Sequence, residues 1–448
     1  MHRNRNKIGM VSLGCAKNQV DTEVMLGLLS QQGYKIVNRS EEADIIIINT
    51  CGFIGPAKEE SIQAIFEQIK YKQQGSCEIL IVTGCLGQRY SKELMEEIPE
   101  IDAVIGTGNY SKIVDIITEV DEGHHHAYLN NLSTAVEDGL PRMLSTDGIT
   151  ACLKIAEGCD NYCSYCIIPM LRGRFRSRSI SSLKREAETL VQNGTRELVI
   201  IAQDVSRYGQ DSNGEFNLVL LLKELAALPD LKRIRVMYCY PDRITHELID
   251  FIAQEEKVCN YLDIPIQHIN QDILSKMNRI TDSDQIRALL NNLNKKMPDI
   301  ILRTSLIVGF PGEGEAEFQE LLDFVEEGHF QHIGVFPYSR EESTPAAAYA
   351  NQVDESVKKE RRNRLMMVQS KVSKRLRRAR QGQKCEVLIE GMESEGLFYG
   401  RSYGEAPEVD GLVYVTSPSP LKAGDFVVTK ITRIFDYDIL GEAYEFSK

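Results

Sequence analysis

The stretch 158–166 reads Gly-Cys-Asp-Asn-Tyr-Cys-Ser-Tyr-Cys and comes directly after the strand-like run 151–155. It carries three closely spaced cysteines, Cys159, Cys163 and Cys166. Four thiolates would complete a zinc site or a ferredoxin cluster, whereas three leave one iron of a cluster free for chemistry. The nearest other thiol, Cys152, lies inside the strand pattern and is badly placed as a fourth ligand. We therefore expect an iron–sulfur cluster with one open iron, with a structural zinc site as the alternative.

The run 151–155 is the first of six strand candidates between residues 150 and 345, which alternate with helix-like segments. The others are residues 197–201, 234–237, 261–264, 300–308 and 332–336. Six βα repeats are too few to close an eight-stranded barrel, so the pattern predicts an open, partial (βα)6 barrel. Its chemistry is expected at the carboxyl ends of the strands.

Polar residues lie within or directly after several of these strands, at the predicted mouth of the barrel. They are Gln203, Asp204, Gln267, His268, Arg303 and Ser305. As a set they are candidates for contacts with a cofactor and a substrate, and Asp204 is counted among the catalytic residues. For any single one, such as His268, a structural role with a backbone carbonyl as partner is the alternative.

Residues 7 to about 120 also alternate between short apolar runs and amphipathic stretches. Near-continuous β-branched runs such as 43–48 and 79–82 are typical of a parallel sheet covered on both faces, so we predict a doubly wound α/β domain. Three cysteines come after its strands and beside a glycine, Cys15, Cys51 and Cys85. Because the carboxyl ends of parallel strands share one edge of the sheet, these thiols can converge into a second cluster site. Three separate buried thiols are the alternative.

The remaining segments complete the domain plan. The segment 358–380 holds eleven Lys or Arg around an apolar stripe. It predicts a helix packed on the barrel, with nucleic-acid contact as the alternative. Residues 383–448 show short strands and turns, which predict a small OB-like β-barrel. The predicted divisions are 1–125, a linker at 126–148, 149–357, a basic linker helix at 358–381, and 382–448.

Length and charge narrow the class of protein. The 448 residues leave room for about three domains of roughly 150 residues. The net charge of −13 leans away from a nucleic acid as the main ligand and favours a basic protein partner. No apolar run approaches the ~20 residues needed to cross a membrane, and we expect no signal peptide in the basic N-terminal residues. Eleven cysteines then favour a reducing, cytoplasmic location.

With six cysteines in these positions, the chain resembles the radical S-adenosylmethionine methylthiotransferases over nearly its whole length. The matching motifs are residues 14–18, 49–53 and 83–87 around the dispersed cysteines, and Arg172-Gly173 after the compact ones. The resemblance implies an auxiliary [4Fe-4S] cluster on Cys15, Cys51 and Cys85 and a radical [4Fe-4S] cluster on Cys159, Cys163 and Cys166. It also implies that the open iron of the radical cluster binds S-adenosylmethionine, that Tyr165 lies against its adenine, and that the last domain is a TRAM barrel.

Two stretches resemble the branch of this family that modifies a ribosomal protein rather than the branch that modifies tRNA. They are residues 202–209, Ala-Gln-Asp-Val-Ser-Arg-Tyr-Gly, and residues 406–411, Ala-Pro-Glu-Val-Asp-Gly. The implied substrate is an aspartate of protein twelve of the small ribosomal subunit. Ala16, where proline is frequent in this branch, is a minor departure.

The charge of the last domain agrees with a basic protein substrate. Residues 383–448 hold twelve Asp or Glu against six Lys or Arg, whereas a barrel that grips tRNA phosphates should be basic. The nearer alternative is methylthiolation of a tRNA adenosine beside the anticodon. A non-enzymatic iron–sulfur scaffold or RNA-binding protein is the more distant one.

The implied activity is that of a transferase with two [4Fe-4S] clusters and S-adenosylmethionine as cofactors. One S-adenosylmethionine is cleaved to a 5′-deoxyadenosyl radical that takes a hydrogen from the β-carbon of the substrate aspartate. A second methylates a sulfur held at the auxiliary cluster, and the methylthio group joins the carbon radical. The resemblance further implies an electron donor such as flavodoxin or ferredoxin and a sulfur carrier, while neither a membrane nor tRNA is expected as a partner.

Overall fold

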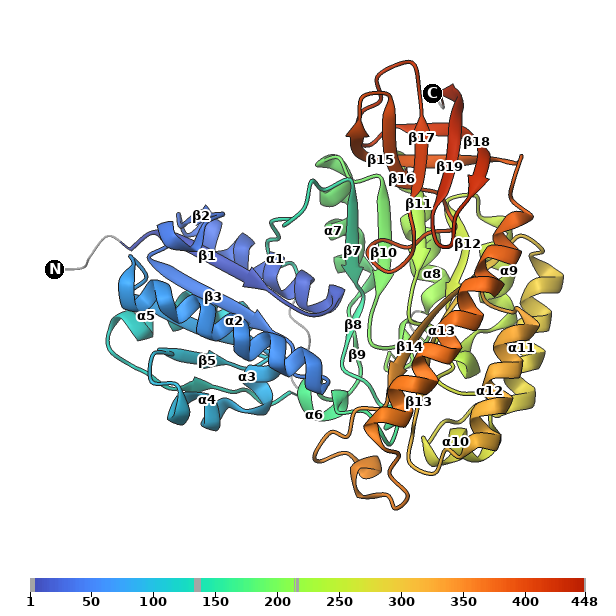
Figure 1. The fold of residues 1–448 in the computed structure, drawn as a ribbon. Coiled ribbons are helices and arrows are strands. Elements are labelled where there is room, and N and C mark those ends of the chain that lie inside the picture. Colours follow the sequence, from blue (N-terminus) through green and yellow to red (C-terminus); the bar gives the residue numbers. More distant parts are fainter. Residues whose placement is uncertain (1–4, 133–137, 213, 215–216, 447–448) are drawn as a thin grey trace.

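The computed structural model of the chain describes residues 5–132, 138–212, 214 and 217–446. Its first domain is built on a six-stranded parallel sheet with the order β2-β1-β3-β4-β5-β6 (Figure 1). The strands are β1 (Lys7–Ser12), β2 (Lys35–Val37), β3 (Ile45–Thr50), β4 (Ile79–Gly84), β5 (Ala103–Ile105) and β6 (Ala127–Tyr128). The helices are α1 (Ala16–Gln31), α2 (Gly55–Gln74), α3 (Cys85–Arg89), α4 (Ser91–Glu97) and α5 (Ile113–Asp121).

Helices cover both faces of this sheet. Ile45 and Ile47 of β3 pack with α1 and α5 on one face, while Ile46 and Ile48 pack with α2 and α4 on the other. A strand that is buried on both faces needs apolar side chains at every position, which explains the unbroken isoleucine run. The predicted doubly wound α/β domain is confirmed.

Two edge strands of the sheet, β2 and β6, have no counterpart in the sequence expectations. They contain three and two residues, too few to form a recognisable apolar pattern. β6 lies inside the segment 126–148 that the sequence predicts as a linker, and it pairs in parallel with β5.

The central domain contains a second six-stranded parallel sheet, with the order β14-β13-β12-β11-β10-β7. Its strands are β7 (Thr150–Lys154), β10 (Glu197–Ile201), β11 (Arg233–Val236), β12 (Val258–Asp263), β13 (Ile301–Val308) and β14 (His332–Pro337). Its helices are α7 (Ile180–Gln192), α8 (Leu218–Ala226), α9 (His246–Gln254), α10 (Gln271–Lys276), α11 (Ser283–Lys296) and α12 (Glu315–Glu327). Neighbouring strands follow chain order and β7 does not pair with β14, so the predicted open (βα)6 barrel is confirmed.

A smaller insertion follows β7. It consists of the two-stranded sheet β8 (Ala156–Glu157) and β9 (Arg176–Ser177), with α6 (Ile168–Arg172) between them in the chain. This insertion contains the cysteine-rich stretch 158–166, and α6 lies where the first two domains meet (Figure 1).

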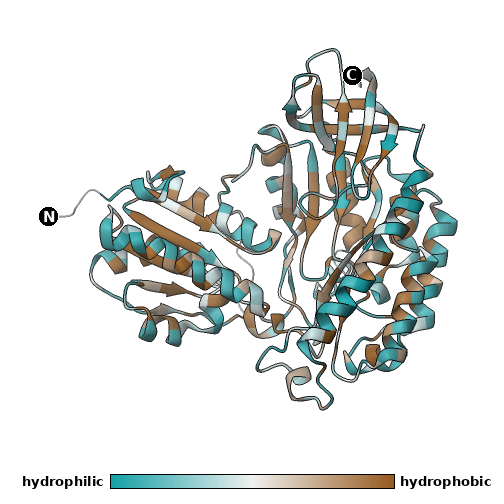
Figure 2. Ribbon diagram, in the orientation of Figure 1, coloured by the Kyte–Doolittle hydropathy of each residue, from teal (hydrophilic) through white to brown (hydrophobic). Residues whose placement is uncertain are grey.

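The chain ends in α13 (Glu355–Arg378) and a closed five-stranded barrel. The barrel strands are β15 (Lys384–Ser394), β16 (Leu397–Arg401), β17 (Val413–Thr416), β18 (Phe426–Ile434) and β19 (Ile439–Phe446). Leu365 of α13 is fully buried in the core of the central domain, which confirms the expected packing of this basic helix on the open (βα)6 barrel. Figure 2 shows hydrophobic strands inside the domains and hydrophilic residues on the outer helices.

The three domains meet on the concave face of the central sheet. Leu198 and Ile200 of β10 point to the outer helices, whereas Val199 and Ile201 join a separate cluster. That cluster also contains Val20 of α1 and Ala406 of the last domain. Because side chains alternate along a strand, one face of β10 builds its own domain and the other binds the two flanking domains. In the described part of the chain, no helix is long and apolar enough to cross a membrane.

Candidate functional site

The structure brings Cys15, Cys51 and Cys85, called here the dispersed trio, to one edge of the first sheet. Cys15 precedes α1, Cys51 follows β3, and Cys85 opens α3 directly after β4. The strands β1, β3 and β4 are neighbours in the sheet. The three thiols therefore share the carboxyl edge of adjacent parallel strands, as the spacing predicts.

Glycines and asparagines let these loops approach one another. A side chain at Gly52 would lie 2.8 Å from the Cys85 carbonyl oxygen, so only glycine fits there. The Asn18 side chain donates to the Thr50 carbonyl at 2.9 Å, and the Asn49 side chain donates to the Asn18 carbonyl at 2.8 Å. These buried bonds hold the loops after β1 and β3 together.

The electrostatics show that the dispersed trio forms one group. Burial raises the pKa of Cys51 to about 11, and the charges of Cys85 and Cys15 add to this rise. Cys15 is exposed to solvent as a residue, although protein atoms surround its thiol on most sides. Burial opposes its ionisation, but Lys17 and Arg172 outweigh that effect and lower the pKa of Cys15. A thiol with a lowered pKa is well suited to bind iron as a thiolate.

Cys159, Cys163 and Cys166, called here the compact trio, lie in the loop between β8 and α6. The loop is anchored to the central domain, since the Ser164 amide donates to the Met277 carbonyl at 3.0 Å. Its Tyr162 has a φ of 49°, an uncommon conformation for a non-glycine residue. Burial raises the pKa of Cys159 to about 12 and raises that of Cys166 as well, with the charges of neighbouring cysteines adding in both cases.

Asp204 is hydrogen-bonded to the compact loop. Its carboxylate is 1% exposed and accepts hydrogen bonds from Asn161 Nδ2 at 2.8 Å, Arg243 Nη1 at 3.0 Å and Ser206 Oγ at 2.6 Å. Asn161 belongs to the compact loop itself. Both carboxylate oxygens are thus bonded to neighbouring side chains, one to Ser206 and the other to Asn161 and Arg243, which favours a positioning role for the residue that the sequence counts as catalytic.

Gln203 is the predicted barrel-mouth residue that points most clearly to a ligand. Its Nε2 donates to Glu157 Oε1 at 2.9 Å. Its Oε1 is buried and has no hydrogen-bond partner among the described residues. Buried polar atoms in folded proteins are nearly always satisfied, so this atom is free for a bound molecule.

Gln267 and His268 lie in the loop after β12. Gln267 adopts a φ of 72° and forms an isolated bridge with Leu306 of β13. His268 is fully buried, accepts a hydrogen bond at Nδ1 from the Asn270 amide, and lies 3.4 Å from Glu313. Glu313 in turn binds the Gly309 amide at 2.8 Å. His268 thus contacts the loop after β13 through Glu313, and its Nε2 has no hydrogen-bond partner among the described residues.

The other predicted contacts occupy the concave face or the compact loop. Arg303 lies 3.8 Å from Asp263 and 3.5 Å from Asp410, and it connects the barrel interior to the last domain. Ser305 is half-buried on β13. Tyr165 packs against a cluster that includes Phe310 and Tyr338, between the compact loop and the ends of β13 and β14.

Arg279, which no sequence pattern singled out, also reaches the compact trio. Its Nη1 lies 3.8 Å from Cys163 Sγ, and its Nη2 donates to the Pro265 carbonyl at 2.7 Å. Its guanidinium lies 3.8 Å from the centre of the Tyr240 ring. It comes just after α10, far along the chain from the cysteines, so only the fold reveals the contact.

The cysteine groups fit clusters better than single ions. Among the described residues, no three His, Cys, Asp or Glu side chains converge closely enough to bind one metal ion. All cysteines in the structure are free thiols. In a [4Fe-4S] cluster three thiolates bind three different irons and stay further apart than ligands of one ion. Three free thiols gathered in each of two places are a donor set that suits two clusters with three ligands each.

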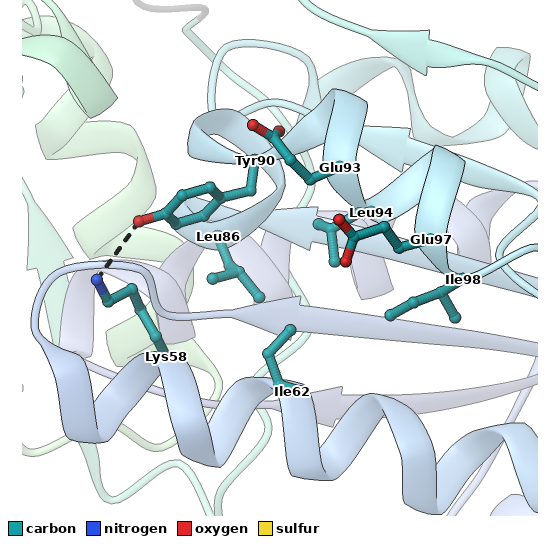
Figure 3. Close-up of a pocket in the computed structure, with 8 residues that line it drawn as sticks. All are labelled: Lys58, Ile62, Leu86, Tyr90, Glu93, Leu94, Glu97 and Ile98. Atoms are coloured by element: carbon teal, nitrogen blue, oxygen red, sulfur yellow. Dashed lines mark hydrogen bonds between the residues drawn. The ribbon is translucent and has the colours of Figure 1, made fainter. Parts of the chain in front are cut away.

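A separate pocket of about 270 Å³ lies between α2 and α4 of the first domain (Figure 3). Its floor is apolar, with Ile62, Leu86, Leu94 and Ile98, and Glu93 and Glu97 stand at its rim. None of the predicted site residues lines it, so it is not part of the candidate active site.

Family models match the three domains. The descriptions are "Uncharacterized protein family UPF0004" over residues 7–106, "Radical SAM superfamily" over residues 153–325 and "TRAM domain" over residues 382–443. Similar curated proteins are called "Ribosomal protein uS12 methylthiotransferase RimO". The one from Desulforamulus reducens is 50% identical over 97% of this chain and 99% of its own length. The one from Clostridioides difficile is 49% identical over 97% and 98%.

Solved structures with a similar fold are radical enzymes. The radical S-adenosylmethionine methyltransferase TsrM from Kitasatospora setae matches with a TM-score of 0.55 and 16% identity, over 76% of this chain and 75% of that one. The cobalamin-dependent S-adenosylmethionine radical enzyme OxsB matches with a TM-score of 0.51 and 13% identity, over 81% and 56%. At these identities the likeness concerns the fold alone.

Proposed function

Because this chain belongs to the family of ribosomal protein uS12 methylthiotransferases, we propose that it methylthiolates the β-carbon of an aspartate in uS12. The observation that supports this most strongly is the presence of two separate trios of thiols on either side of α6. When bound, two [4Fe-4S] clusters and S-adenosylmethionine supply the radical and sulfur chemistry. The chain supplies binding, orientation and exclusion of water.

We assign one cluster to each trio. The compact trio would hold the radical cluster, and the dispersed trio, of which Cys15 is exposed, would hold the auxiliary cluster. The free Oε1 of Gln203, and Tyr165 of the compact loop, are the side chains that we assign to binding S-adenosylmethionine. Arg303 and Ser305 line the concave face, and Gln267, His268 and Asp204 would hold the surrounding loops in place.

The basic helix α13 gives little support to the tRNA alternative. Most of its cations are bound within the chain, so few remain for phosphates. Arg361 pairs with Glu313 at 2.8 Å, Arg364 with Glu315 at 3.0 Å and Lys374 with Asp436 at 2.8 Å. Just after the helix, Arg380 pairs with Glu405 at 2.8 Å. The acidic last domain also favours a basic protein substrate.

Eleven free cysteines are consistent with a reducing, cytoplasmic location, which we propose with uS12 as the partner. We further propose a flavodoxin- or ferredoxin-type electron donor and a sulfur carrier, because the chain needs an electron and replacement sulfur for each cycle.

The direct test offers two substrates to the same enzyme. Anaerobically purified and cluster-loaded protein is incubated with S-adenosylmethionine, a reductant and either recombinant uS12 or bulk tRNA. We expect a mass gain in uS12 that corresponds to CH3S in place of hydrogen, located on one aspartate by peptide fragmentation. Modification of tRNA without modification of uS12 would overturn the proposal, and Cys51→Ala is the matched inactive control.

A further inference from the structure

Arg172 lies between the two cysteine trios. It is the last residue of α6, the helix that starts two residues after Cys166, and it is 2% exposed. Ile167 and Leu171 on the same segment pack against Cys85 of the first domain. The segment that carries the last ligand of the compact trio therefore also contacts the dispersed trio.

The two Nη atoms of Arg172 contact different groups. Nη1 donates to Asp21 Oδ2 at 2.7 Å and lies 3.2 Å from both oxygens of Glu157. Nη2 donates to Asn18 Oδ1 and points at Cys85 Sγ, 3.7 Å away. Arginine can satisfy both sides at once because its donors form a rigid planar fork.

Neighbouring charges fix this arrangement. Lys154 pairs with Asp21 and with Glu157, the latter at 2.8 Å, so two buried acids meet two buried bases. We call Asp21, Lys154, Glu157 and Arg172 the Arg172 bridge. Glu157 stands two residues before Cys159, and Asp21 lies on α1 close to Cys15. The bridge thus links the start of the compact loop to the dispersed trio.

On the basis of the proposed function, we propose that Arg172 is a positioning residue for the auxiliary cluster, and that its N–H···S bond to Cys85 raises the reduction potential of that cluster. A cluster gains negative charge when it is reduced. A nearby cation and a hydrogen bond to a ligand sulfur both stabilise that charge, and burial strengthens the effect.

Arg142 provides a matched control within the same chain. Its side chain is also buried, and it joins Glu23 of α1 to Glu186 of α7 at 2.8 Å each, so it also bridges the first two domains. Its remaining hydrogen bond goes to the Cys152 carbonyl at 2.6 Å, which is not a thiol of either trio. Loss of Arg142 should therefore loosen the same domain contact without touching a cluster ligand.

The test isolates the auxiliary cluster in the full-length chain. Cys159, Cys163 and Cys166 are replaced by Ala, the protein is reconstituted anaerobically, and the midpoint potential is determined by EPR-monitored redox titration. We expect Arg172→Lys to lower the reduction potential of the auxiliary cluster, because lysine keeps the charge but loses the planar fork of donors. Arg172→Gln should lower the potential further, because the charge is lost as well. Arg142→Lys and Arg142→Gln should leave it at the parent value.

The outcomes separate this inference from the proposed function. An unchanged potential in Arg172→Gln with full iron content would overturn the inference, and so would an equal shift in Arg142→Gln. If Arg172→Gln fails to retain iron, the midpoint potential of the milder variant Arg172→Lys is compared with that of the parent instead. A parent protein without any bound iron would instead contradict the assignment of the dispersed trio, and with it the proposed function.

Discussion

The carboxylate of Asp204 accepts a hydrogen bond of 2.8 Å from Asn161, which lies between Cys159 and Cys163 in the compact loop. Arg243 Nη1 donates to both residues, to the Asn161 side chain at 2.9 Å and to Asp204 at 3.0 Å. Three side chains from three loops thus form a closed triangle beneath the compact trio. We expect this triangle to hold the cysteines in position.

Asp204→Asn should impair cleavage of S-adenosylmethionine without removing any cluster ligand. The neutral side chain leaves Arg243 without its buried partner, which we expect to cost about 1.5–3 kcal/mol of stability. A shift of the loop should slow cleavage by about tenfold to a hundredfold. The measurement is 5′-deoxyadenosine formation together with iron content. The control is Asp242→Asn, since Asp242 lies 3.4 Å from the same arginine but is exposed; an equal defect there would contradict the argument.

The two trios should serve different steps of the reaction. Cys51→Ala should abolish methylthiolation yet leave reductive cleavage of S-adenosylmethionine largely intact, because the compact trio is untouched. Cys163→Ala should abolish both activities. Both products are measured by mass spectrometry in the same reaction, with iron content and EPR spectra as controls for cluster loading. An equal loss of cleavage in the two variants would mean that the trios do not act separately.

Arg279→Gln should lower the reduction potential of the radical cluster. The guanidinium lies 3.8 Å from Cys163 Sγ, so its loss removes a cation and an N–H donor from a ligand sulfur. The potential is measured by EPR titration in a chain whose dispersed trio is replaced by Ala. Arg287→Gln serves as the control, since Arg287 pairs with Glu327 at 2.7 Å on the outer surface; if both variants shift alike, the contact with sulfur is not the cause.

His332 joins the central domain to the last domain as a neutral imidazole. Its Nε2 lies 2.9 Å from the Gly404 carbonyl, and its Nδ1 lies 3.1 Å from Arg377 Nη2. Because arginine can only donate, Nδ1 of the neutral ring accepts from Arg377 and Nε2 carries the proton; Asp410 Oδ1 lies 3.1 Å from the same Nδ1. Burial lowers the pKa of His332 to about 4; the nearby Asp410 opposes this shift and Arg377 adds to it.

The stability of this junction should fall as the pH falls from about 6.5 towards 4. In that range the unfolded chain binds a proton at His332 and the folded chain does not, so protonation favours unfolding. The contribution is fully present above pH 6.5, and its loss amounts to about 3 kcal/mol at most. Urea denaturation of the wild type and of His332→Gln at pH 7.5 and pH 5 measures it. A wild type that loses no more stability than the variant would refute the expectation.

Much of the fold follows from local pattern. The isoleucine run of β3 and the six strand runs of the central domain predict two parallel sheets, because buried parallel strands require continuous apolar side chains. Short edge strands cannot be predicted in this way. β6 has two residues and makes sense only beside β5, so no local pattern could reveal it.

The sequence by itself determined which residues are the candidates for the chemistry, because thiols at strand ends and in one tight loop are distinctive by type and spacing. It also determined the charge of the last domain. Only the tertiary structure decided how these parts are supported: it placed His268 against Glu313, Asp204 beneath the compact loop, and Arg172 and Arg279 on cysteine sulfurs. These contacts join residues from different domains or distant loops. Their partners are chosen by packing, which spacing along the chain does not record.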